Sequence, residues 1–86
     1  MPDLDATVGA ELQEAANNVL WVLVGGAGYP PGSFTEALIK AMARADRDNL
    51  NLLLQVFTAL AICVHAYKND PDGVEQLHRW AKGDMD

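Results

Sequence analysis

Few side chains in this 86-residue sequence could perform covalent or metal chemistry. His65 and His78 are the two histidines, Cys63 is the one cysteine and Ser33 is the one serine. Neither histidine has a second His or Cys at the spacing of a zinc ligand pair. Ser33 lacks the Gly-x-Ser-x-Gly surroundings of a hydrolase nucleophile. The sequence therefore predicts no catalytic residue, no metal site and no enzyme activity.

Two stretches are similar to ligand-binding loops but do not meet their requirements. The glycine-rich residues 25–33 could present backbone amides to a phosphate, yet they lack the lysine that precedes the Ser or Thr of a P-loop. Asp70, Asp72 and Glu75 could gather carboxylates, but a calcium loop needs glycine in its sixth position. Here Gly73 occupies the fourth position. Both stretches are more simply helix connections, and no cofactor is expected.

Composition limits the class of protein further. Half of the residues are hydrophobic, and twelve acidic against six basic side chains give a net charge of -6. A chain of this length, residues 1–86, forms one domain whose small core is marginal without a partner. The acidic balance opposes direct nucleic-acid binding, which uses clustered Lys and Arg, but leaves an acidic mimic of nucleic acid as an alternative. The acidic N-terminus and the lone Cys63, expected to be a buried thiol, favour a cytoplasmic protein.

The first expected helix covers residues 7–24, with Thr7 or Asp5 as its N-cap. Its apolar side chains recur at helical spacing and are Val8, Leu12, Ala15, Ala16, Val19 and Leu23. The apolar end of this segment, VLWVLV, is also compatible with a short strand. The glycines in residues 25–28 then end the helix, because glycine accepts the left-handed backbone of a helix C-cap.

A second helix is expected from Ser33 to about Ala45. Ser33 and Glu36 have the spacing of a capping box, in which each side chain bonds the other's free backbone amide. The apolar face of this helix would consist of Phe34, Leu38, Ala41, Met42 and Ala45. Asp46 and Asp48 then either cap a new helix or mark a bend, and the new helix is favoured.

A long central helix is expected at about residues 48–69. Residues 49–67 form a run of 19 uncharged positions, close to the shortest bilayer span, so a small membrane-associated protein is an alternative. A narrow polar stripe favours a buried helix outside the membrane instead, and its members are Asn51, Gln55, Thr58, His65 and Asn69. Pro71 and an Asp72–Glu75 capping box predict a short C-terminal helix that carries Val74, Leu77, Trp80 and Ala81.

These elements predict an all-α fold, a compact bundle of three main helices plus a short C-terminal helix. The apolar side chains exceed what one face of each helix can bury. Either the helices cover this surplus completely, or part of it meets another chain, as exposed apolar patches usually do. We favour the second alternative. The expected partner or oligomer interface consists of Trp21, Val24, Tyr29, Leu52, Val56 and Trp80.

A distinctive run lies in the middle of the chain. It consists of YPPGSF at residues 29–34, TEALIKAMARAD at 35–46, Asn49, Phe57 and HAYKND at 65–70. This run resembles short proteins of unassigned function from actinobacteriophages and their actinobacterial hosts, over about residues 28–69. The resemblance implies a phage or prophage origin and supplies no functional residue. Such relatives often have Phe-Pro inside the long helix, whereas Thr58 follows Phe57 here, which predicts an unbroken helix.

The sequence as a whole favours a non-catalytic accessory protein that binds another protein and self-associates, with a homodimer as the expected state. In a phage setting it would act in the host cytoplasm, either modulating a host factor or serving as an assembly component. The acidic nucleic-acid mimic and the membrane-associated protein remain the alternatives.

Overall fold

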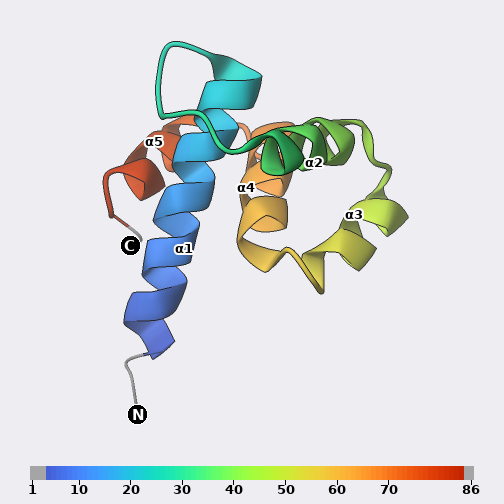
Figure 1. The fold of residues 1–86 in the computed structure, drawn as a ribbon, viewed down its shortest axis with the longest axis horizontal. Helices are drawn as coiled ribbons and strands as arrows, with labels where there is room; N and C mark the ends of the chain where they lie inside the picture. Colours follow the sequence, from blue (N-terminus) through green and yellow to red (C-terminus); the bar gives the residue numbers. More distant parts are fainter. Residues whose placement is uncertain (1–3, 85–86) are drawn as a thin grey trace.

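The computed structural model describes residues 4–84, with side chains described from residue 9 onward. These residues form five α-helices and one π-helical turn, η1, which continues the first helix (Figure 1). The elements in chain order are α1 (Leu4–Val19), η1 (Leu20–Val24), α2 (Ser33–Arg44), α3 (Arg47–Leu54), α4 (Thr58–Asn69) and α5 (Gly73–Ala81). The expected all-α class is confirmed.

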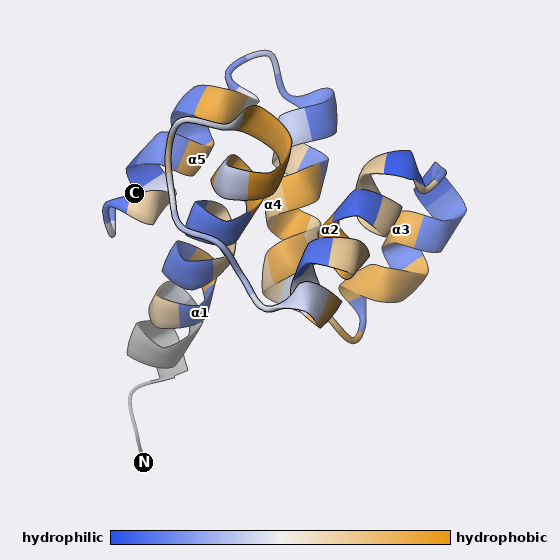
Figure 2. Cartoon of the chain, turned by 45° about the horizontal axis from the view of Figure 1, so that its top comes forward, coloured by the Kyte–Doolittle hydropathy of each residue, from blue (hydrophilic) through white to orange (hydrophobic). Residues whose placement is uncertain are grey.

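Helix α4 is the centre of the fold and contacts each of the other four α-helices. It lies between α1 and the α2–α3 pair, while α5 packs against α1 and α4 (Figure 1). Most of α4 is apolar, as its orange ribbon shows in Figure 2. Its buried residues Cys63 and Val64 join one core cluster with side chains from the surrounding elements, such as Val19, Leu20, Ile39, Met42 and Leu77. The expected buried thiol is therefore confirmed.

The expected long central helix is wrong, because the chain breaks between α3 and α4. Helix α3 ends at Leu54 and α4 begins at Thr58. Phe57, between them, has φ -114° and ψ 60°, outside the helical region. Its ring contacts the ring of Phe34 at the start of α2, with 6.2 Å between centroids. A packing contact from a distant part of the chain thus accompanies the break.

Folding back also gives α3 a neighbour. One straight helix over residues 48–69 would be about 33 Å long, nearly the 35 Å length of the whole molecule. With the break, α3 lies beside α4 and buries Leu50. Within residues 4–84, no helix combines the length and the apolar character needed to cross a bilayer.

Side-chain capping matches expectation at α3 but not at α2. The Asp46 carboxylate accepts a hydrogen bond of 2.8 Å from the backbone N–H of Asn49, so the new helix after Asp46 is confirmed. Ser33, by contrast, is the first residue of α2, and the N-cap position belongs to Gly32. Gly32 has no side chain to cap with, and its carbonyl accepts a bond from the N–H of Glu36. The Ser33–Glu36 capping box is therefore wrong.

The other two helix starts also differ from expectation. Helix α1 begins at Leu4, so Asp5 and Thr7 lie inside it and neither is its N-cap. Asp72 occupies the N-cap position of α5 but makes no capping bond, because its backbone (φ -105°, ψ 23°) is outside the extended conformation that capping uses. Helix α5 begins two residues after Pro71, which was expected in the first helical position.

The buried face of α2 is rotated from the expected one. Ile39 and Met42 are fully buried, because α2 packs on α4 and η1. Phe34 is 68% exposed and Ala41 also faces solvent, although both were expected on the buried face. An aromatic side chain at the start of α2 is therefore available at the surface.

The VLWVLV segment continues α1 as a π-helical turn, so the alternative of a strand is wrong. Gly25 ends the turn with φ 83°, and its N–H bonds the carbonyl of Leu20 at 2.8 Å. The positive φ is one that glycine accepts, as the glycine pattern predicted, but the ψ of 155° lies outside the left-handed helical conformation expected for the C-cap. The connection to α2 then returns to α1, where the buried Asn18 side chain donates a bond of 3.2 Å to the carbonyl of Tyr29.

Helix α5 is fixed to α1 through its last carbonyl group. The side-chain amides of Gln13 and Asn17 both donate to the oxygen of Ala81, at 3.2 Å and 3.1 Å. Helix ends leave carbonyl groups without intrahelical partners, and these two amides satisfy one of them. Trp80 precedes the anchored residue, so this bonding sets where its indole lies.

Candidate functional site

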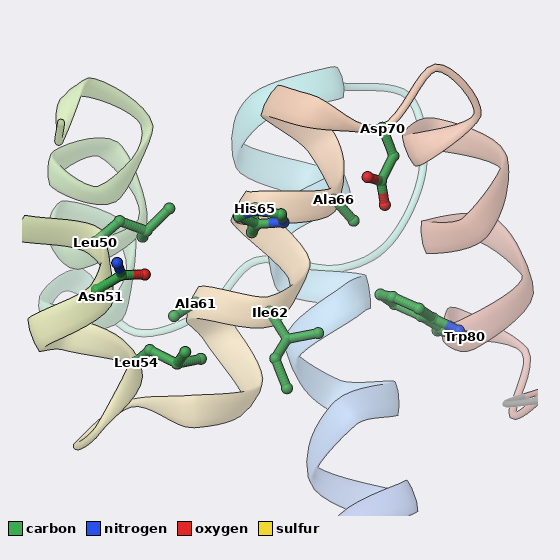
Figure 3. Close-up of a pocket in the computed structure, with 9 residues that line it drawn as sticks. All are labelled: Leu50, Asn51, Leu54, Ala61, Ile62, His65, Ala66, Asp70 and Trp80. Carbon is green, nitrogen blue, oxygen red and sulfur yellow. The ribbon is translucent and has the colours of Figure 1, made fainter. Parts of the chain in front are cut away.

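A surface groove lies between α3, α4 and α5 (Figure 3). Its volume is about 270 Å³. We refer to it as the apolar groove, and it is lined by Leu50, Asn51, Leu54, Ala61, Ile62, His65, Ala66, Asp70 and Trp80. It is slightly smaller than typical small-molecule sites, which begin at about 300 Å³.

The groove exists because α3 and α5 flank α4 on two sides. Small residues of α4, Ala61 and Ala66, are buried along the groove and leave space above them. Leu54 comes from α3, and the indole of Trp80 reaches in from α5 (Figure 3). Ile62 projects from α4 between these two walls. Without the break before α4, α3 could not form the first wall.

One acidic side chain lies at the α5 side of the groove. Asp70 follows the last residue of α4 and is half-buried. Its carboxylate points into the groove on the same side as Trp80 (Figure 3). No described residue gives this carboxylate a hydrogen bond or an ion pair. The groove therefore combines an apolar floor with a carboxylate that has no partner inside the described chain.

Basic side chains lie in an adjoining hollow on the α3 side. This hollow has a volume of about 550 Å³ and shares Leu50, Asn51 and His65 with the groove. Arg47 and Lys68 also line it. The Lys68 ammonium is already engaged, because it donates to the carbonyl of Ala45 at 2.6 Å, at the C-terminal end of α2. Along the surface, the charge thus changes from acidic beside α5 to basic beside α3.

Five of the six expected interface residues are exposed. Val56 is 73% exposed and Leu52 62%, on α3 and the turn that follows it. Trp21 and Tyr29 are each 46% exposed, and Val24 is also exposed, on η1 and the connection to α2.

These five residues lie in two separate regions of the chain (Figure 1). The sixth, Trp80, is half-buried against the core and lines the apolar groove. The structure therefore does not bring the expected residues into one patch.

Of the nine residues that line the apolar groove, only Trp80 was among the expected interface residues. Leu54 and Ile62 lie within residues 48–69, which were expected to form one buried helix, yet both are more than a third exposed. Asp70 was considered as a member of a carboxylate cluster and then assigned to a helix connection. The one available signal was the sequence Asp70–Pro71, which places an acidic side chain at a helix end, but nothing in it indicates an apolar neighbour.

The remaining reactive group is buried in the core. Burial raises the pKa of the Cys63 thiol to about 12, which keeps it protonated and weakly nucleophilic near neutral pH. Its sulfur lies 4.0 Å from the carbonyl oxygen of Leu12. Across the described residues, no three His, Cys, Asp or Glu side chains gather closely enough to hold a metal ion.

The surface therefore offers groups for binding: apolar side chains, an indole and a carboxylate without a partner. Comparisons with protein-family models, with curated proteins and with solved structures find no match. The geometry of the apolar groove and of the exposed apolar side chains carries the functional argument.

Proposed function

We propose that this chain is a small non-catalytic protein-binding module that self-associates as a dimer. The observation that carries the proposal is the exposure of large apolar side chains on and next to α3. Leu52, Val56 and Phe34 are each more than 60% exposed. Phe34 also contacts Phe57, the residue after Val56, so Phe34 packs next to the turn that carries Val56. Large apolar side chains exposed on neighbouring parts of the chain are typical of an interaction surface.

Self-association follows from the size of the chain. A domain of 86 residues buries a smaller fraction of its surface than a larger one, so covering apolar area adds a meaningful share of stability. In a two-fold dimer the same surface patch of both copies is in contact, so the exposed apolar side chains of one helix can pack against their counterparts in the second copy. Helix α3 presents Leu52 in this way. A second exposed group, Trp21, Val24 and Tyr29, leaves a surface for a different partner.

Light scattering on the purified protein tests the dimer. We expect a mass near twice the 9.3 kDa of one chain. The double variant Leu52→Gln, Val56→Gln should return to the monomer mass. Val74→Gln is the matched control, because Val74 is an exposed apolar residue on a different helix. A monomer mass for the unmodified protein at all concentrations would remove self-association.

The proposed setting is a phage or prophage. It is supported by the resemblance of YPPGSF and the segments after it to proteins from actinobacteriophages and their hosts. In the host cytoplasm, the chain would modulate a host factor or serve as an assembly component. Mass spectrometry separates these two roles. An assembly component that stays in the particle would be detected in purified virions, whereas a modulator of a host factor would be detected only in infected cells. Absence from both preparations would contradict the phage setting.

A further inference from the structure

We propose that the apolar groove binds a cationic amphipathic segment of another protein. An apolar side chain of the segment would lie over Ile62 between Leu54 and Trp80, and a Lys or Arg beside it would pair with Asp70. This inference rests on the proposed protein-binding function and specifies the chemistry of the partner.

The apolar half of the site is built from three large side chains. Leu54 and Ile62 are 37% and 38% exposed, and Trp80 is half-buried with its indole directed into the groove (Figure 3). A volume of about 270 Å³ admits side chains but not a folded element. An inserted apolar group would remove area from water on all three residues, which is the main source of binding free energy. A segment with projecting apolar side chains therefore fits the space.

The charged half of the site selects a cation. The carboxylate of Asp70 and the indole of Trp80 lie on the same side of the groove, and the carboxylate has no partner among the described residues. A Lys or Arg placed there would donate a charge-assisted hydrogen bond to the Asp70 carboxylate and make a cation–π contact with Trp80. An acidic side chain in the same place would be repelled. The net charge of -6 also steers cationic partners towards the protein.

The adjoining hollow fixes the direction of the segment. Its cations are Arg47 and Lys68, and it shares His65 with the groove but includes neither Trp80 nor Asp70. The Lys68 ammonium is held by carbonyls at the end of α2, which leaves Arg47 as the cation available to a partner. The basic residue of the segment therefore lies towards α5, and a neutral or acidic residue lies towards α3.

The test uses the full chain and two model peptides of about 14 residues, long enough for one amphipathic helix. One peptide combines Leu with Lys at helical spacing, and in the other Glu replaces every Lys. Trp21→Phe leaves Trp80 as the only tryptophan of the two. Its fluorescence then reports on the groove alone, and titration calorimetry gives the affinity.

We expect the Lys peptide to bind and to change the emission of Trp80, and the Glu peptide to do neither. Asp70→Asn should weaken binding of the Lys peptide about tenfold. Asp72→Asn is the matched control, because it removes one acidic charge two residues after Asp70, from an exposed side chain that bonds Gln76. It should change the affinity for the Lys peptide by less than about twofold. Circular dichroism confirms that both variants keep their helices.

Three results would overturn the inference. The first is equal binding of both peptides, or equal effects of Asp70→Asn and Asp72→Asn. The second is that neither peptide binds. In that case, a dimer that is lost in the Leu52→Gln, Val56→Gln variant would still support the proposed function, and only the groove inference would fail. The third is a Trp80 emission that changes with protein concentration alone and not with peptide, which would make a second copy of the chain the occupant.

Discussion

Replacing Gly73 with alanine should separate α5 from α4. Gly73 is the first residue of α5 and is buried against the backbone of α4. An added methyl carbon would overlap the carbonyl oxygen of Ala66 and lie 2.7 Å from its carbonyl carbon. Backbone atoms inside a helix cannot rotate away as a flexible side chain can. The same oxygen accepts the N–H of Asp70, so the overlap also disturbs the end of α4.

The size of the effect follows from these contacts. Forcing an extra methyl group into a close-packed contact costs about 1–3 kcal/mol. A shift of α5 also exposes part of Leu77, which is fully buried and whose complete burial is worth about 1.5–3 kcal/mol. We expect Gly73→Ala to lower the free energy of unfolding by about 3 kcal/mol. In a domain of this size, that corresponds to a decrease in Tm of roughly 12–24 °C.

Gly9→Ala is the matched control, since it makes the same change inside α1. No atom lies within 4 Å of a methyl carbon added at Gly9. Alanine is favoured over glycine in a helix by about 0.5–1 kcal/mol, so this variant should gain stability. Urea unfolding followed by circular dichroism measures both. If Gly73→Ala stays within about 0.5 kcal/mol of the unmodified protein, or if both variants shift the same way, the packing account is refuted.

Two further predictions concern α3 and the core. Asp46→Ala should lower the free energy of unfolding by about 1 kcal/mol, because the backbone N–H of Asn49 loses the carboxylate that caps it. Asp48→Ala, in the same turn, should lower the free energy of unfolding by less. Equal decreases in the two variants would contradict a capping role for Asp46. Cys63 should resist iodoacetamide until urea unfolds the chain. Folding raises the pKa of this thiol from 9.0 to about 12, so the thiol ionises at lower pH in the unfolded chain than in the folded one. The free energy of unfolding should therefore decrease as pH rises above about 9, by up to about 1.4 kcal/mol per pH unit. An equally steep decrease in Cys63→Ala would argue against this cause.

Local signals in the sequence predicted some of the helix boundaries. The glycines of residues 25–28 end the first helical segment, and Asp46 begins α3, because each acts on its own neighbours through backbone conformation or a capping bond. The break at Phe57 has no such signal, since residues 55–57 contain neither Gly nor Pro. Its non-helical backbone accompanies a ring contact with Phe34, 23 residues earlier in the chain. A long-range contact of this kind is not encoded in local spacing.

The candidate site was predictable only in part for the same reason. Trp80 and the surplus of apolar surface could be identified from residue types alone. The apolar groove depends on α3 folding back beside α4, so Leu54 and Ile62 could not be placed before the break was known. The role of Asp70 depends in turn on the position of Trp80, which is fixed by bonds between α1 and α5.

The exposed apolar surface of α3 and the following turn is proposed to bind another protein chain, first of all a second copy of this chain. Amide NMR spectra of the isotope-labelled protein over an about hundredfold dilution test this proposal most directly. We predict concentration-dependent shifts at Leu52, Val56 and their neighbours, with the resonances of buried residues such as Val64 unchanged. A spectrum that stays the same at every concentration, with the relaxation of a monomer, would contradict the proposal.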